Sequence, residues 1–205
     1  MNSVWTDASP GWSTYGAEQT QNASEIYTYL VNWGCSSNAA YAILGNMQHE
    51  SYLNPGQWQI GSNYDPSAGF GLCQWTPSTK ISDITGPAPA DMSNYLDQLG
   101  YLINTPGQWS TQFVDSSGWS SYYNLQVPYI ASWQDFKTDT THSVSDLTKA
   151  FMACWERPAA AYAAVPQRVA YAMHWAGQGP TPPPLPITPA VMIILLAKAA
   201  SRWRL

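Results

Sequence analysis

Glu50 is the residue whose position most clearly suits chemistry. It follows Ala40, Ile43 and Met47 at helical spacing, so it carries an apolar stripe to the last turn of a predicted helix, which Asn54-Pro55-Gly56 then ends. A carboxyl group in that place meets desolvation and the negative end of the helix dipole, and both favour its protonated form. Glu50 is therefore a candidate general acid, the group that protonates a leaving oxygen in glycoside cleavage.

A solvent-facing glutamate at a helix end is the ordinary alternative, and spacing alone favours it. Glycoside cleavage usually needs a second carboxylate as base, nucleophile or electrostatic support. Asp65 is a candidate, but an aspartate before a proline is as typical of a simple turn. Asp83 has a weaker claim, because we expect it on a helix surface. For Glu156, followed by Arg157 and Pro158, an ion pair or a helix cap is favoured over catalysis.

Other chemistries find little support in the residue spacing. His49-Glu50 lacks the second histidine that a zinc peptidase motif requires, so no metal site is expected. The three cysteines show no CxxC spacing, which favours three buried thiols over a disulfide framework or a zinc site. No flanking signature supports a Cys–His peptidase. We therefore expect an activity that needs no metal or organic cofactor.

The elements that would position Glu50 are mostly helical. Residues 57–75 alternate short polar and aromatic runs with turn residues, which suits a small antiparallel hairpin or a pair of loops. The predicted fold class is α+β, mostly helical, with this small β patch lining a cleft. Helices are predicted, from periodicity and capping residues, at about 24–33 (capped by Ser24), 37–50 (capped by Ser36 or Ser37), 77–84, 91–103, 146–156 (capped by Ser145) and 166–175, with short ones near 109–113 and 133–136.

Two segments together resemble a known family. Residues 45–55 read GNMQHESYLNP and residues 69–77 read GFGLCQWTP. This pair resembles the phage tail lysozyme family, and the wider lysozyme and lytic-transglycosylase superfamily, in which a glutamate ends a helix and a Gly-Leu-x-Gln segment follows. Further matches are QLGYL at 98–102 and AFMACWERP at 150–158. The resemblance covers about residues 23–177 and implies a lysozyme-like domain.

The resemblance implies roles for single residues. Glu50 would be the catalytic acid, with Asp65 as the candidate base or stabiliser. Gln74 and the backbone around Gly71 would line the sugar site, with Trp75 close by. The aromatic rings of Tyr52 and Tyr64 are candidates for stacking on sugar faces, as is that of Trp58, although packing is the ordinary role of such rings and is favoured for Trp75.

The implied activity is cleavage of the β-1,4 bond between N-acetylmuramic acid and N-acetylglucosamine in bacterial peptidoglycan. Two alternatives stay open. If Asp65 points away from the cleft, Glu50 alone would serve a lytic transglycosylase, in which the sugar's own 6-hydroxyl replaces water. A non-catalytic tail or wall-binding subunit would keep the lysozyme shape, but it gains nothing from a carboxylate on an apolar stripe.

Composition agrees with a sugar-binding protein. Of the 205 residues, 10% are charged and 14% aromatic, which argues against disorder and suits display of Trp and Tyr to polymeric sugar or to other subunits. Residues 1–179 carry a net charge of −8, which argues against a nucleic-acid partner. Residues 180–205 carry +3.

We expect four segments: an N-terminal arm (1–22), the catalytic domain (23–179), a Pro-rich linker (180–186) and an apolar, basic tail (187–205). The apolar run 190–197 is too short to span a bilayer, and docking on a phage tail subunit is favoured over membrane contact. The first residues lack the pattern of a signal peptide. The expected location is thus a phage tail or the host cell wall, reached through the virion or a holin.

Overall fold

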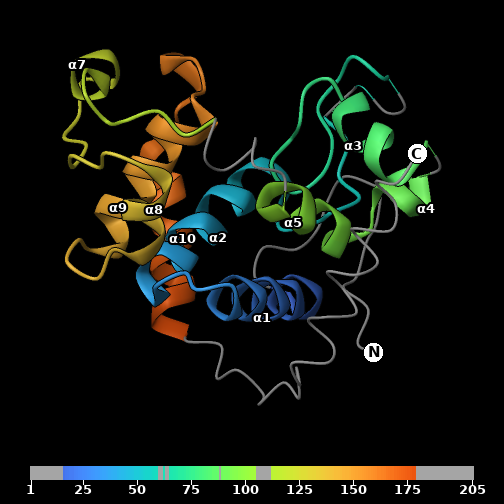
Figure 1. Cartoon of the computed structure of the whole chain (residues 1–205), viewed down its shortest axis with the longest axis horizontal. Coiled ribbons are helices and arrows are strands. Elements are labelled where there is room, and N and C mark those ends of the chain that lie inside the picture. Colours follow the sequence, from blue (N-terminus) through green and yellow to red (C-terminus); the bar gives the residue numbers. More distant parts are fainter. Residues whose placement is uncertain (1–15, 60–61, 63–64, 88, 105–111, 179–205) are drawn as a thin grey trace.

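The computed structural model describes residues 16–178, except 60–61, 63–64, 88 and 105–111 (Figure 1). Five predicted features lie wholly or largely outside the described residues: the N-terminal arm, Tyr64, the short helix near 109–113, the linker and the tail. The elements are α1 Ala17–Asn32, α2 Ser37–Ser51, α3 Thr79–Thr85, α4 Pro89–Met92, α5 Tyr95–Asn104, α7 Trp119–Tyr123, α8 Trp133–Thr138, α9 Val144–Phe151, the π-helical turn η1 Met152–Glu156, the 3₁₀ turn η2 Ala160–Tyr162 and α10 Val165–Gln178.

Helix α2 is the centre of the fold and packs against α1, α9 and α10 (Figure 1). Of the two predicted caps, Ser36 is the one observed, because its hydroxyl accepts a hydrogen bond from the Ala39 N–H at 3.1 Å. The side chains of the predicted stripe, Ala40, Ile43 and Met47, are fully buried. Figure 1 shows α3, α4 and α5 on one side of α2 and α7, α8 and α9 on the other. Helix α2 therefore runs between these two groups of helices, and Glu50 lies in its last turn.

The contact between α2 and α10 depends on Gly45. A Cβ atom at Gly45 would lie 2.5 Å from the Ala172 Cβ and 2.6 Å from the Arg168 carbonyl oxygen. Both of those atoms belong to or adjoin the backbone of α10, so neither moves without shifting the helix. The absence of a side chain at residue 45 thus allows α10 to approach closely enough to place Arg168 beside Glu50.

We predict that Gly45→Ala lowers the free energy of unfolding by about 3 kcal/mol, because overpacking forces the two helices apart. The matched control is Gly177→Ala in α10, another helical glycine, where a Cβ would meet nothing within 4 Å. That change should leave stability the same or raise it by up to about 1 kcal/mol. Urea unfolding of both variants measures the difference. Equal stability of the two would contradict the proposed close contact.

Three helices differ from the prediction. Helix α1 begins at Ala17 rather than Ser24, so residues 17–22 of the expected arm are helical. Two polar residues of this stretch, Gln19 and Asn22, are buried, and they bind carbonyl groups beyond the end of α2. The helix expected over 91–103 is interrupted after Met92, where the Asn94 side chain accepts a hydrogen bond from the Leu96 N–H and so starts α5. Helix α9 is capped by Ser143 rather than Ser145.

The predicted β-hairpin is wrong. Within the described part of residues 57–75 there are only two isolated antiparallel bridges, Trp58 with Phe70 and Phe70 with Trp75. The chain reverses too sharply for a ladder, since Gly71 (φ 82°) and Gln74 (φ 48°) both have left-handed backbone. Residues 68–73 are also buried in succession, whereas the residues of a half-exposed strand alternate between core and solvent. The fold is mostly helical, and turns supply this wall.

The cysteine prediction is confirmed, since Cys35, Cys73 and Cys154 are buried free thiols. None of the helices in the described ranges has both the length and the hydropathy to cross a membrane.

Candidate active site

Glu50 forms an ion pair with a buried arginine. An Arg168 N–H donates to Glu50 Oε1, with 2.5 Å between Nη2 and the oxygen. The Glu50 side chain is 20% exposed and that of Arg168 only 2%. Arg168 is also held from behind, since Nε donates to the Ala163 carbonyl at 2.9 Å and Nη1 to Asn46 Oδ1 at 3.0 Å. The sequence pattern indicated an apolar setting for Glu50, and the structure adds a buried positive charge beside its carboxyl group.

The turn after Glu50 is fixed by α1. Tyr52 and Leu53 both have left-handed backbone, with φ of 57° and 62°. Their carbonyl oxygens accept hydrogen bonds from Gln19 Nε2 at 3.0 Å and Asn22 Nδ2 at 2.9 Å. Buried amide groups that meet buried carbonyls in this way keep backbone groups satisfied where the helix ends. Glu50 therefore lies on a rigid helix end rather than a frayed one.

Ser51 and Gln98 join the end of α2 to the second segment that resembles the family, residues 69–77. The Ser51 hydroxyl donates to the Leu72 carbonyl at 3.0 Å. Buried Gln98 accepts from the Leu72 N–H at 2.9 Å and donates to the carbonyls of Pro55 and Met92, both at 2.7 Å. A Cβ at Gly71 would lie 2.6 Å from Gln98 Oε1, so only glycine allows this approach. The two motifs recognised in the sequence are thus held side by side.

A pocket of about 260 Å³ lies at Glu50. Its walls come from the 73–80 segment on one side and from residues 112 and 155–158 on the other. The lining residues are Glu50, Cys73, Gln74, Trp75, Thr76, Lys80, Gln112, Trp155, Glu156 and Pro158.

The structure brings three of the predicted site residues to this pocket: Glu50, Gln74 and Trp75. The Gln74 Nε2 donates to the carbonyls of Gln57 and Gly71, each at 3.1 Å, which orients the amide. Trp75 is buried and meets the Tyr101 ring edge-on at 6.1 Å, in line with a packing role. Gly71 supports the wall without lining the pocket, and Tyr52 lies half-buried in the turn outside it.

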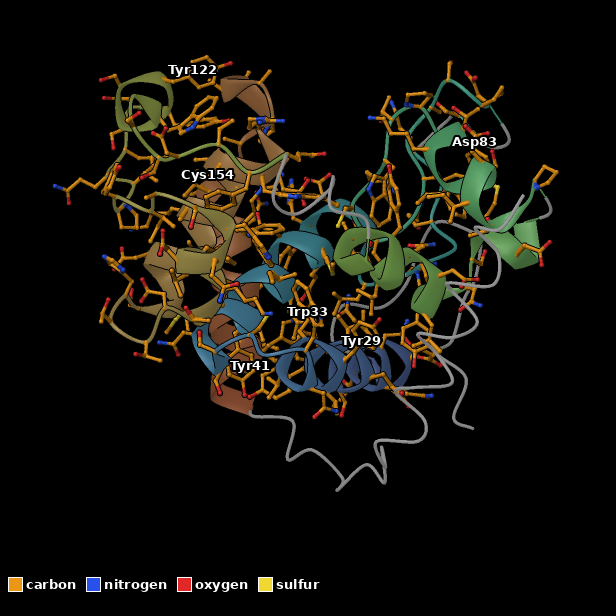
Figure 2. All side chains as sticks on the ribbon, in the orientation of Figure 1. Tyr29, Trp33, Tyr41, Asp83, Tyr122 and Cys154 are labelled. Carbon is orange, nitrogen blue, oxygen red and sulfur yellow. The ribbon has the colours of Figure 1, made fainter. Side chains whose placement is uncertain are left out.

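Asp65 is not brought to the pocket. It is exposed, and its Oδ1 accepts hydrogen bonds from the Ser67 hydroxyl (2.7 Å) and N–H (2.8 Å), which is the ordinary turn arrangement. The hydroxyl and then the N–H of Ser67 lower the pKa of Asp65. Asp83 is exposed on α3, as expected (Figure 2).

The pocket instead holds Glu156 as a second carboxyl group. Burial, and then the negative charge of Glu50, raise the pKa of Glu156 well above its ordinary value, against the opposing effect of Arg168. Neighbouring Cys73 responds similarly: burial, Glu156 and Glu50 raise the pKa of its thiol, which makes it a weak nucleophile. Burial, and then the positive charge of Arg168, lower the pKa of the His49 imidazole.

Sequence reasoning missed Arg168, although a signal was present. Arg168 shares one face of α10 with Ala172 and Trp175, both buried, at spacings of four and three residues. A cation on an apolar stripe, in a domain with few basic residues, calls for a buried anionic partner.

Comparison with known proteins agrees with these motifs. A family model described as phage tail lysozyme matches residues 21–178. Morphogenesis protein 1 of Bacillus phage B103 is 35% identical over 161 residues, which is 77% of this chain and 39% of that protein. The chain therefore spans about two fifths of the length of this curated relative.

Proposed function

The chain belongs to the phage tail lysozyme family, and from this premise we propose that it cleaves the β-1,4 bond between N-acetylmuramic acid and N-acetylglucosamine in bacterial peptidoglycan. Glu50 is the proposed general acid. The observation that carries the proposal is the position of Glu50 at the end of a buried helix, where its carboxyl group opens into a pocket opposite Gln74.

In this reaction Glu50 protonates the glycosidic oxygen while the bond from that oxygen to the sugar carbon breaks. Charge then develops on the sugar ring in an oxocarbenium-like transition state, and an ionised carboxylate nearby stabilises it. Water attacks the sugar carbon and returns a proton to the site. These steps need only side chains, in keeping with the expected independence from cofactors.

The pocket volume suits a site that encloses only the reacting part of a polymer. At about 260 Å³ it is slightly smaller than the roughly 300–1,000 Å³ typical of pockets that enclose a whole small molecule. Gln74, Trp75 and Lys80 on one wall face Gln112, Trp155 and Pro158 on the other, so the glycan strand would continue beyond both ends.

A lytic transglycosylase is the second candidate. The exposed turn that holds Asp65 favours it, because that carboxylate does not reach the pocket to activate water. In that reaction Glu50 acts first as acid and then as base, and the 6-hydroxyl of N-acetylmuramic acid closes onto its own ring.

We propose that the activity serves a phage, either on the virion tail or as a lysin at the host wall. Its support is the family and the name of the relative, a morphogenesis protein. Peptidoglycan is the proposed substrate, and tail subunits are proposed partners through residues 187–205, which lie outside the described residues. A wall-binding subunit without activity is the alternative from another class.

Incubating the full chain with purified peptidoglycan and analysing the soluble fragments by mass spectrometry tests the proposal. We expect disaccharide-peptides with a reducing N-acetylmuramic acid end, which borohydride reduces. Fragments with 1,6-anhydro ends would identify the transglycosylase instead. Absence of soluble sugar fragments would contradict both enzymatic proposals and favour the binding subunit.

A further inference from the structure

Glu156 lies in the proposed active site but has no assigned task. The residue keeps some exposed surface, yet its Oε1 atom is enclosed and finds no hydrogen-bond partner among the described residues. A buried carboxyl oxygen without a partner is costly to a folded protein, so such an atom in a pocket points to a functional use.

The backbone holds Glu156 in this place. It ends the π-helical turn η1, which closes with a 2.8 Å hydrogen bond from the Arg157 N–H to the Met152 carbonyl. The carbonyls of Cys154 and Trp155 accept hydrogen bonds from the Val114 N–H and from Gln112 Nε2. Single π-turns inside helices are rare and are frequent at functional sites. Here the turn directs Glu156 into the pocket.

Arg157 does not neutralise Glu156. Its side chain donates to the Gln112 carbonyl at 2.8 Å, and within the described ranges no ion pair joins it to Glu156. The expectation of a cap is met by the backbone of Arg157, whereas the expected ion pair does not form. The buried cation of the site is instead Arg168, which is bound to Glu50.

The charges therefore favour a single proton on two carboxyl groups. Arg168 offers one positive charge, and two ionised glutamates would leave a net negative charge in a largely buried site. One proton on the pair makes the three groups neutral together. The other titratable or charged groups that line the pocket or influence these three are Cys73 and Lys80 on the facing wall, His49 on α2, and Tyr123 and Arg157 near Glu156.

We propose that Glu50 and Glu156 share one proton, and that Glu156 is the positioning residue that holds it in the free enzyme and delivers it to Glu50 during turnover. The inference rests on the proposed function of Glu50. In the transfer an O–H bond of Glu156 breaks and one forms at Glu50, which then protonates the leaving oxygen. The attacking water gives its proton back to the pair, so the site ends as it began.

The test compares Glu156→Gln with wild type. Glutamine keeps the size, neutrality and hydrogen-bonding capacity of a protonated glutamate, but it cannot transfer a proton. We expect kcat to fall about 100-fold or more, with KM and the unfolding temperature little changed. The alkaline limit of activity should move to lower pH, because the pocket then lacks the carboxyl group that stores the proton, whose pKa is raised in the wild type. Wild-type activity and an unchanged pH profile in Glu156→Gln would overturn the inference.

Further variants distinguish failure of this inference from failure of the proposed function. Glu18→Gln, at an exposed position in α1, should behave as wild type. If Glu50→Gln is inactive while Glu156→Gln is fully active, this inference fails and the proposed function stands. If both variants are fully active, the proposed function fails as well. Glu156→Asp, which keeps a transferable proton, should recover part of the lost activity.

Infrared spectroscopy gives a readout that needs neither activity nor a folded variant. A protonated carboxyl band should persist in the wild-type protein at neutral pH, and its absence would contradict the proposal.

The pH dependence of the free energy of unfolding gives a second check. The folded pKa of Glu156 lies above its ordinary 4.5, so its contribution to stability is full below pH 4.5 and is lost as pH rises through the folded value. Glu156→Gln should flatten that decline.

Discussion

Replacing Glu50 with glutamine should slow the release of soluble peptidoglycan fragments about 1,000-fold. Glutamine has the shape of glutamate, and its amide oxygen can still accept the hydrogen bond from Arg168. The change therefore removes the transferable proton and the negative charge while it leaves the end of α2 in place. Fragment release by purified protein, measured as a function of time, gives the rate.

Two controls define what the loss would mean. Glu18→Gln makes the same chemical change on the exposed face of α1 and should leave the rate unaltered. Asp65→Asn tests the other carboxylate predicted from the sequence, and we expect nearly wild-type activity because its side chain stays in an exposed turn. Undiminished activity of Glu50→Gln would rule out the acid role of Glu50. A large loss in Asp65→Asn would restore Asp65 as a catalytic candidate.

Replacing Arg168 with methionine should lower the free energy of unfolding by about 3–5 kcal/mol, the usual cost of removing one partner from a buried ion pair. Methionine fills much of the same space but donates no hydrogen bond. Three acceptors then lose their donor: Glu50 Oε1, Asn46 Oδ1 and the Ala163 carbonyl. Thermal unfolding should show the loss as roughly 2–4 °C in Tm for each kcal/mol.

Arg157→Met is the matched control, since Arg157 is exposed and, among the residues that the structure describes, its side chain donates to one carbonyl, that of Gln112. It should cost less than about 1 kcal/mol. A double-mutant cycle adds Glu50→Gln to Arg168→Met. The double variant should regain part of the lost stability, because no uncompensated carboxylate remains. Equal stability of Arg168→Met and Arg157→Met would contradict a structural role for the Glu50–Arg168 pair.

The two largest expected effects concern one cluster, in which Arg168 links catalysis to stability. Arg168 pairs with the proposed acid and also binds α2 through Asn46, while Asn46 donates to the Ala42 and Thr148 carbonyls. Asn46 thereby joins α2 to both α9 and α10. A change at Arg168 should thus affect folding and activity together, whereas Glu50→Gln should affect activity far more than folding.

Several features were predictable because they depend on neighbours in the chain. The cap of α2 at Ser36 and the stripe ending at Glu50 follow from local hydrogen bonding and helical period. The same reasoning failed where tertiary contacts override local preference. Residues 1–22 were expected to form an arm, but Gln19 and Asn22 are buried in α1 and bind the turn after α2. Residues 57–75 suggested a hairpin, but consecutive burial replaces alternation there.

The sequence by itself thus determined the helix that carries Glu50, the segment that faces it and the family to which both belong. The tertiary structure decided which charges meet. Arg168 is 118 residues from Glu50 in the chain, and it becomes the partner of Glu50 only because Gly45 allows α10 to approach α2. Glu156, expected to serve a local ion pair or cap, enters the same pocket through a π-turn. Periodicity and capping reveal the face on which a residue lies, whereas the partner of a buried charge depends on how those faces pack in three dimensions.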